Sequence, residues 1–326
     1  MRSLDESGIP YRTTAREFAQ TRLLLEYWNV PHTMVGAHGG KSKVRKVLKL
    51  LERTGQLMME VRKDGIQLAV SHGSRSQVTA ARLMAIRSLV MLDYEYTETT
   101  IFNALATYIL MPSLIPEQRL RSAGINMKKL IRYDGFKEEL YLSSFVPDPG
   151  FRKEIGVADD QVLVTVRPPG IVGNYHDSRS ESLLLCAIDH VSSVPNAVCL
   201  VVHKTSLEKD LILSHIGTGR ANVRFQEKAV DGLQLLFHSD IAISGGGTMN
   251  RESALLGTET YSIFTGRKPY LDEFLESEGK LRFLDSNDDV KKIEIARRKK
   301  SGTFALTNRN IVSSVSSIIK EKALHT

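Results

Sequence analysis

The segment from Ser244 to Glu252 carries the clearest chemical signal in this chain of 326 residues. It reads Ser-Gly-Gly-Gly-Thr-Met-Asn-Arg-Glu and follows the apolar run Ile241–Ile243, which is typical of a buried strand. Glycines let a backbone approach a ligand closely, and the first N–H groups of a helix favour a negative charge. The pattern predicts a binding site for a diphosphate, with the Glu252 carboxylate within reach of ribose hydroxyl groups. The predicted ligand-binding residues are Ser244, Gly245, Gly246, Gly247, Thr248, Asn250 and Glu252.

A plainer interpretation of the same segment is a tight structural turn, in which Glu252 interacts only with the helix dipole. Arg167 is a further candidate for binding an anion. It follows the apolar run Val162–Val166 and precedes two prolines, so we expect its guanidinium at the carboxyl edge of the sheet. A structural salt bridge is the alternative for Arg167.

Three side chains in the first half of the chain are candidates for proton transfer: Glu95, His72 and His38. Each follows or ends a predicted strand, and histidine and glutamate are common general bases. A histidine at a strand end is often only a polar cap, and this remains the alternative for both histidines. No Asp-x-Asp pair occurs at a strand end, so we expect no metal ion and no cofactor other than the substrate.

Several of these runs together resemble the family called domain of unknown function 354, which is regarded as a family of predicted glycosyltransferases. The resemblance extends over nearly the whole chain and is carried by four runs: Ser244–Gly266, Val166–Pro169, Ser71–Ser74 and Gly36–Ser42. More distantly, the chain is similar to hydrolysing UDP-N-acetylglucosamine 2-epimerases and to the lipid-linked N-acetylglucosaminyltransferase of peptidoglycan synthesis. The resemblance implies the GT-B fold and a UDP-linked sugar as donor. It assigns diphosphate binding to Gly245–Thr248 and ribose binding to Glu252.

The comparison with the epimerases favours glycosyl transfer. The epimerases have an aspartate where this chain has Ser74, and a histidine where it has Arg167, whereas Glu95 matches an epimerase glutamate. Two of three acid–base groups are therefore changed, so we expect a transferase acting on an unknown acceptor. An epimerase-like enzyme and a non-catalytic protein that binds nucleotide sugars remain the alternatives.

The pattern of apolar runs predicts the elements that position these residues. Short β-branched runs alternate with longer helical stretches, which is typical of α/β proteins with parallel sheets. The turn-rich run Phe145–Gly150 indicates a linker. We therefore expect two doubly wound, Rossmann-like domains facing a cleft: an acceptor-side domain over residues 1–147, and a nucleotide-sugar-binding domain with a C-terminal helix over residues 148–326. Predicted strands are 11–14, 32–35, 66–71, 88–92, 108–111 and 129–133 in the first domain, and 162–166, 197–202, 223–225, 241–244 and 260–264 in the second.

The start of the chain differs from that of a complete doubly wound domain. Met1–Ser7 has the composition of the second half of a helix, and Gly8 is placed to end it. We expect the first strand of the N-terminal domain to be missing, which would truncate the acceptor side. The alternative is a domain that begins with a short helix.

Composition restricts the class of partner. The net charge is +7 and the pI is about 9.3, but no zinc-finger spacing or aromatic RNA-binding motif occurs, so we expect no nucleic acid partner. Basic residues are concentrated in Lys41–Lys63 and Lys291–Lys300. A solvated helix face explains such runs, and contact with an anionic membrane that carries a lipid-linked acceptor is the sharper hypothesis. The N-terminus has no apolar signal segment and the two cysteines have no paired spacing, so we expect a cytoplasmic protein, with peripheral contact at the inner face of the membrane as an option.

Overall fold

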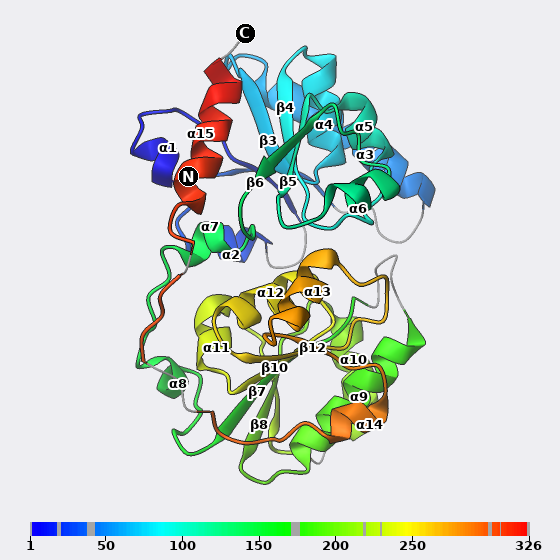
Figure 1. The fold of residues 1–326 in the computed structure, drawn as a ribbon, viewed down its shortest axis with the longest axis vertical. Helices are drawn as coiled ribbons and strands as arrows, with labels where there is room; N and C mark the ends of the chain where they lie inside the picture. The colour runs from blue at the N-terminus through cyan, green and yellow to red at the C-terminus, as the bar shows by residue number, and fades with distance from the viewer. Residues whose placement is uncertain are drawn as a thin grey trace. The chain divides into compact units, whose positions relative to one another are not determined.

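The computed structural model describes residues 2–17, 21–37, 43–170, 177–217, 220–228, 230–298, 302–306 and 308–324 (Figure 1). The chain forms two compact units. The first contains Met1–Ser143 together with Thr307–Thr326, and the second contains Ser144–Leu306.

Within its described residues, the second unit is built on a six-stranded parallel sheet in the order β12-β11-β10-β7-β8-β9. If the strands of this unit are numbered 1 to 6 along the chain, their order in the sheet, beginning at β9, is 3-2-1-4-5-6. This is the strand order of the doubly wound Rossmann fold. Its strands are β7 (Val162–Arg167), β8 (Ala197–Val201), β9 (Val223–Phe225), β10 (Ile241–Ser244), β11 (Glu259–Ser262) and β12 (Arg282–Phe283). Its helices are α8 (Phe151–Glu154), α9 (Ser178–Ser192), α10 (Ser206–Ile216), α11 (Gly232–His238), α12 (Gly247–Leu255), α13 (Tyr270–Ser277) and α14 (Asn287–Lys291).

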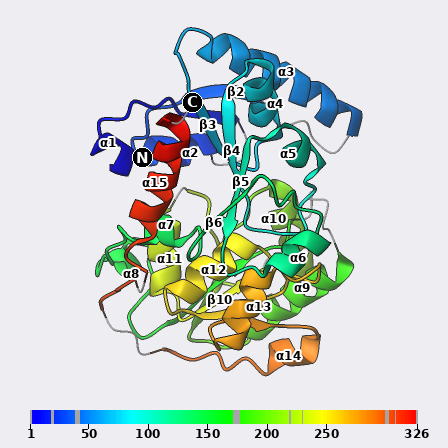
Figure 2. The same ribbon diagram turned by 45° about the horizontal axis from the view of Figure 1, so that its top comes forward.

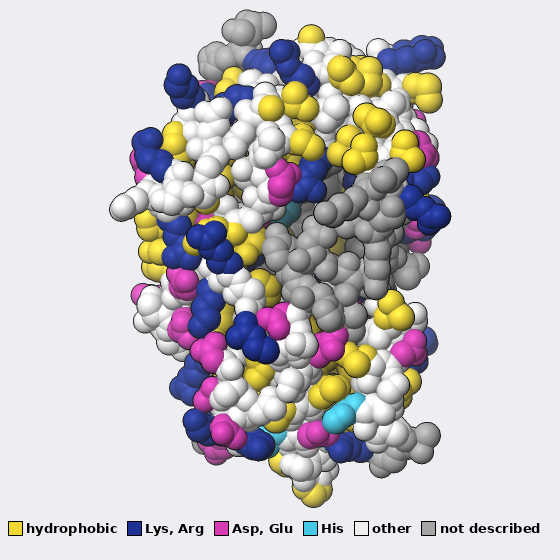
Figure 3. Space-filling model, turned by 90° about the vertical axis from the view of Figure 1, so that its right-hand side faces the viewer, with side chains coloured by type: hydrophobic (Ala, Val, Ile, Leu, Met, Phe, Trp, Pro, Cys, Tyr) yellow, Lys and Arg dark blue, Asp and Glu magenta, His cyan; other side chains and the backbone are white. Residues whose placement is uncertain are grey.

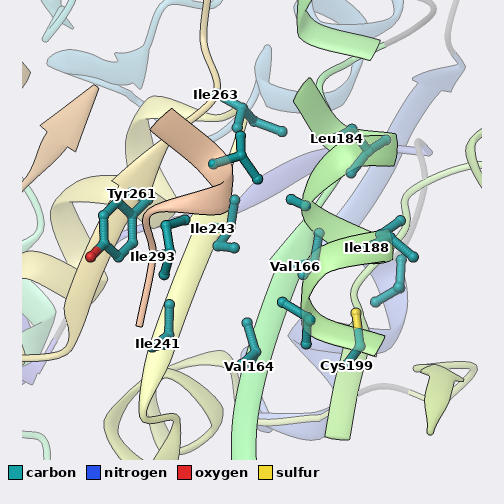
Figure 4. Close-up of a cluster of buried hydrophobic side chains, with 14 of the residues drawn as sticks. Val164, Val166, Leu184, Ile188, Cys199, Ile241, Ile243, Tyr261, Ile263 and Ile293 are labelled. Carbon is teal, nitrogen blue, oxygen red and sulfur yellow. The ribbon is translucent and has the colours of Figure 1, made fainter. Parts of the chain in front are cut away.

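Both faces of this sheet are buried, which explains the unbroken apolar runs in the sequence. In β7, Val164 and Val166 pack with Leu184 and Ile188 of α9, whereas Leu163 packs on the other face with Phe151 of α8. Figure 4 shows the first of these clusters between the strands and α9. The core therefore holds the carboxyl ends of the strands in place.

The first unit contains two parallel sheets among its described residues: the pair β1-β2 and the four strands β3-β4-β5-β6 in chain order (Figure 2). Its strands are β1 (Thr14–Glu17), β2 (Thr33–Ala37), β3 (Leu68–His72), β4 (Arg87–Met91), β5 (Tyr108–Pro112) and β6 (Leu130–Tyr133). Its helices are α1 (Arg2–Asp5), α2 (Thr21–Tyr27), α3 (Lys43–Val61), α4 (Arg75–Leu83), α5 (Thr100–Leu105), α6 (Glu117–Ser122), α7 (Glu139–Leu142) and α15 (Ile311–Leu324).

The C-terminal helix α15 belongs to the first unit, which corrects the assignment of this helix to the domain beginning at residue 148. Ile311 and Val315 are buried against Leu89, Leu110 and Tyr133, which lie on β4, β5 and β6. The apolar stripe of α15 thus covers one face of the four-stranded sheet. The chain passes between the units at residues 143–144 and returns at residues 306–307, rather than crossing once at residues 147–148.

The predicted α/β class with parallel sheets is confirmed. Most predicted strands agree with the structure within one or two residues, but β1 begins at Thr14 rather than at Tyr11, and β12 is not among the predicted strands. β12 has only two residues, Arg282 and Phe283, which is too short for a periodic pattern.

Candidate functional site

The carboxyl ends of β7 and β10 meet at one edge of the second sheet. These strands are neighbours, and Arg167 at the end of β7 pairs in register with Ser244 at the end of β10. Strand order reverses between β7 and β10, and ligands of doubly wound sheets bind at this switch point. The fold thus brings together the two segments that the sequence analysis selected.

The glycine turn after β10 depends on close packing. A Cβ atom on Gly245 would lie 2.6 Å from the Cα atom of Pro169, so a larger residue cannot occupy this position without displacing the backbone. The Gly245 N–H donates to the carbonyl of Arg167 over 3.1 Å, and the Gly246 N–H donates to the hydroxyl of Ser244 over 3.0 Å. These bonds hold the turn against the end of β7.

Helix α12 begins without a side-chain cap. Its N-cap is Gly246, which has no side chain, whereas α9, α10 and α11 are capped by Asp177, Thr205 and Asp231. The first N–H groups of a helix have no partner within the helix and carry a partial positive charge. With Thr248 exposed in the first turn, the start of α12 can receive an anionic group.

Cationic side chains stand beside this helix start. Arg167 is half-buried, and no described residue forms a hydrogen bond with its guanidinium. Burial lowers the pKa of Arg167, and the carboxylates of Glu208 and Glu252 raise it. Burial also lowers the pKa of Lys204, which follows β8, and the charge of Arg167 lowers it further. Two like charges in a partly buried place are stabilised by a bound anion.

The remaining predicted residues of the segment differ in their surroundings. Glu252 is half-buried in the second turn of α12, close enough for its carboxylate to raise the pKa of Arg167. Asn250 is fully buried; its Nδ2 donates to the Ser262 hydroxyl over 3.0 Å and lies 3.4 Å from a carboxylate oxygen of Asp272. Asn250 therefore attaches α12 to its neighbours in the core.

A second polar cluster lies in the first unit, where β3 and β4 end side by side. Nε2 of His72 lies 3.0 Å from Oδ1 of Asp93, and the ammonium of Lys137 donates to Oδ2 of Asp93 over 2.7 Å. The Asp93 side chain is 9% exposed and that of His72 is 48% exposed. A buried carboxylate held by a lysine thus fixes one ring nitrogen of a histidine whose remaining surface faces solvent.

The other two candidates for proton transfer are less favourably placed. The carboxylate of Glu95 is fully buried, and Nε of Arg119 donates to it over 2.8 Å. This ion pair connects the Glu95 carboxylate to α6. His38 lies outside the described residues.

Sequence reasoning missed the parts played by Asp93, Lys137 and Lys204. A signal was available for Asp93: β3 and β4 are parallel neighbours, so residues just after each strand meet at one edge. Lys204 likewise follows β8, the neighbour of β7. Lys137 reaches Asp93 from 44 residues away, and no local pattern indicates that contact.

Within the described ranges, no group of three or more His, Cys, Asp or Glu side chains is arranged to hold a metal ion. None of the helices in those ranges is both long enough and apolar enough to cross a membrane.

Comparison with known proteins gives three results. The family described as "Protein of unknown function (DUF354)" matches residues 1–313. An uncharacterized protein of Methanocaldococcus jannaschii, MJ0665, is 24% identical over 314 residues, which cover 94% of this chain and 89% of that protein.

Solved structures with the same fold include UDP-GlcNAc 2-epimerase from Neisseria meningitidis bound to UDP-GlcNAc, with a TM-score of 0.66, 11% identity and coverage of 95% of this chain and 99% of that one. They also include Anabaena Alr3699/HepE in complex with UDP, with a TM-score of 0.51, 14% identity and coverage of 95% and 84%. These likenesses show a GT-B-like fold.

Proposed function

The chain belongs to the DUF354 family, and we propose that it is a glycosyltransferase that takes a sugar from a nucleoside diphosphate, most simply UDP. One observation carries this proposal: the uncapped start of α12 lies at the switch point beside the guanidinium of Arg167. The binding of UDP or UDP-sugars by proteins of the same fold supports it.

Glycosyl transfer requires stabilisation of the departing diphosphate. Fixed N–H dipoles and a partly buried cation stabilise the charge that develops on a leaving group more effectively than water does, because they need no reorganisation. We assign this task to the N–H groups of Gly247 and Thr248 together with Arg167. Glu252, on the same helix, is assigned to the ribose hydroxyl groups. The chain's own cations thus supply the positive charge that the reaction needs.

The acceptor hydroxyl must lose a proton, and we assign this task to His72. If Nε2–H donates to Asp93, then Nδ1 carries the lone pair that takes the proton. Among the described residues none hydrogen-bonds Nδ1. His72 is therefore preferred over the buried Glu95 as the general base.

A 2-epimerase is the second candidate, because epimerases share the fold. Ser74 stands where the epimerases have an acid–base aspartate. Its hydroxyl caps α4 by accepting from the Gln77 N–H over 3.4 Å and also accepts from Arg53 over 3.2 Å. That position is therefore structural. Incubation with UDP-N-acetylglucosamine in deuterium oxide separates the two reactions, since epimerisation exchanges the C2 hydrogen and transfer does not.

The nucleotide site is tested by calorimetric titration of the full chain with UDP, GDP and ADP. Replacing Arg167 by Gln removes a charged hydrogen-bond donor, a change that typically costs about 1.5–3 kcal/mol, or roughly 10- to 100-fold in Kd. Arg282→Gln is the matched control, since Arg282 is an exposed arginine of the same unit. Equal affinity of both variants for UDP, or no binding of any nucleotide by the unaltered chain, contradicts the proposal.

For the acceptor we propose a hydroxyl group of a lipid-linked molecule, and for the location the cytoplasmic side of the membrane, where nucleotide-activated sugars are made. The free thiols of Cys186 and Cys199 are consistent with a reducing compartment. Proteinase protection of the chain in intact cells tests the location.

A further inference from the structure

Helix α3 buries two polar side chains and exposes several apolar ones. Its inward face contains Arg53, Thr54 and Leu57. Nε of Arg53 donates to the carbonyl of Val35 over 2.8 Å, and Nη1 donates to the hydroxyl of Ser76 over 2.5 Å. These bonds to β2 and α4 fix the rotation of α3 about its axis, so the exposure of its other face follows from the fold.

The outward face of α3 carries a row of large apolar side chains. Leu48 and Leu51 are 59% and 57% exposed, and Val47 beside them is 58% exposed. Met59, two turns further on, is 67% exposed, and Gly55 lies between, with open space where a side chain would be. Residues 48, 51, 55 and 59 follow the spacing of a single helix face. We call this row the α3 apolar face.

A neighbouring element also exposes a large apolar side chain. Leu83 ends α4, which packs against α3, and it is 65% exposed. Figure 3 shows exposed hydrophobic side chains gathered on the part of its face that belongs to the first unit. Single exposed leucines are ordinary, but several on adjacent elements mark a surface that another apolar body covers.

Basic residues are concentrated in the sequence where α3 begins. The sequence from residue 41 to residue 49 is Lys-Ser-Lys-Val-Arg-Lys-Val-Leu-Lys, with five cations and no acid. Arg45 is exposed, and the Lys49 side chain is 42% exposed beside Glu52. Exposed leucines bordered by lysine and arginine are the composition of helices that lie in the headgroup layer of a bilayer.

We propose that the α3 apolar face docks on an anionic phospholipid bilayer, with Val47, Leu48 and Leu51 entering the apolar layer and the side chains of Arg45 and Lys49 meeting the headgroups. A second copy of this chain is a poorer occupant, because a two-fold interface brings the same cations against themselves. The inference does not depend on the identity of the donor or on catalysis, so it can fail while the proposed reaction stands.

Vesicle flotation of the full chain tests this proposal. We compare vesicles of phosphatidylcholine alone with vesicles containing phosphatidylglycerol, at low and high salt. We expect flotation only with the anionic vesicles and its loss in high salt, because surface charge is screened within roughly 10 Å at 0.1 M salt. Leu48→Ser combined with Leu51→Ser should reduce the bound fraction at least tenfold.

Two further variants complete the test. Val146→Ser changes a side chain of the second unit that is 75% exposed, and it should float like the unaltered chain. Arg45→Gln combined with Lys49→Gln should weaken binding by roughly 30-fold, since each cation near an anionic surface contributes about 1 kcal/mol. The leucine variants should keep the melting temperature of the unaltered chain, which separates lost docking from lost folding.

Three outcomes would overturn the proposal: no flotation with anionic vesicles, equal flotation with both kinds of vesicle, or undiminished flotation of the double serine variant. Sedimentation adds a fourth. A dimer of the unaltered chain that the double serine variant dissociates, without vesicle binding, would assign the α3 apolar face to self-association.

Discussion

At the scale of single residues, polar side chains near the glycine turn differ in burial and in hydrogen bonding. Arg167 and Asn250 are both polar and both adjoin the glycine turn. Arg167 is half-buried and makes no hydrogen bond with a described residue, whereas Asn250 is fully buried and bonds to Ser262. The sequence around Asn250 does not reveal its burial, because burial of a helix residue depends on which face the sheet covers.

Asp93 is expected to act through His72. Asp93→Asn preserves the shape of the side chain, but its amide can hold the imidazole in the tautomer whose Nδ1 carries a proton. Loss of a correctly oriented base typically lowers a transfer rate by about 10²–10⁴-fold. We expect this loss in the rate of UDP release from a UDP-sugar with membrane lipid extract as acceptor, and an unchanged Kd for UDP.

The exposed Glu117, whose side chain is 62% exposed, supplies the control variant Glu117→Gln. A wild-type rate in Asp93→Asn would remove Asp93 from the mechanism. A loss of UDP affinity instead of rate would show that the change acts on folding or on the donor site.

The two thiols should differ in reactivity. Burial raises the pKa of Cys199 to about 12, and burial also raises the pKa of the half-buried Cys186. Because thiolate is the reactive form, we expect iodoacetamide at pH 8.5 to modify Cys186 slowly in the native chain and Cys199 only after unfolding in urea. Mass spectrometry of the peptides measures both.

The raised pKa also has a consequence for stability. The pKa of Cys199 is about 12 in the fold and returns to its ordinary value of 9.0 on unfolding. The protonated thiol therefore contributes stability that is fully present below pH 9.0 and is lost as the pH rises towards about 12. Early native-state labelling of Cys199 would contradict the buried position of β8.

At the scale of elements, we expect that adding a side-chain cap to the start of α12 raises the stability of the fold and abolishes UDP binding. Gly246 has φ −128° and ψ 125°, which any residue adopts, and a Cβ atom there would lie 3.7 Å from the Ser244 hydroxyl. Gly246→Asp introduces a cap like those of α9 and α11. We expect a gain of a few tenths of a kcal/mol in the free energy of unfolding. We also expect loss of UDP binding, because the new carboxylate occupies the position proposed for the diphosphate.

Gly246→Ala is the matched control, since it adds the same Cβ atom without an acceptor. Thermal unfolding with and without UDP distinguishes the variants. Retained UDP binding in Gly246→Asp would show that α12 does not receive the diphosphate.

Prediction from sequence succeeded for elements with a strong local pattern. The strand β7 and the turn after β10 follow from an unbroken apolar run and from three glycines. The position of α15 does not follow from its sequence, because an apolar stripe shows that a helix is covered but not by which sheet. The orientation of α3 was also unpredicted, because the burial of Arg53 requires partners on β2 and α4.

At the scale of the whole molecule, the second unit is continuous in sequence and the first is not. A fragment of residues 144–306 retains its six-stranded sheet and both covering layers of helices. We therefore expect this fragment to unfold cooperatively in urea and to bind UDP. A fragment of residues 1–143 lacks α15, so the apolar face formed by Leu89 and Leu110 is exposed.

Addition of a peptide covering residues 302–326 should increase the urea midpoint of the 1–143 fragment, because it restores the contact of Ile311 and Val315 with the sheet. An unrelated helical peptide is the control. A stable 1–143 fragment with no response to the peptide would show that α15 is dispensable.

The return of α15 to the first unit also affects biosynthesis. Residues 1–143 emerge from the ribosome long before residue 311. The four-stranded sheet therefore lacks its covering helix while the entire second unit is translated. Domains generally fold as units during synthesis, and exposed apolar surface on unfinished ones invites aggregation. The second unit is thus able to fold first although it comes second in the chain. Translation that stops between residues 306 and 311 leaves a complete second unit attached to a first unit that exposes part of its core, a product that chaperones and proteases recognise.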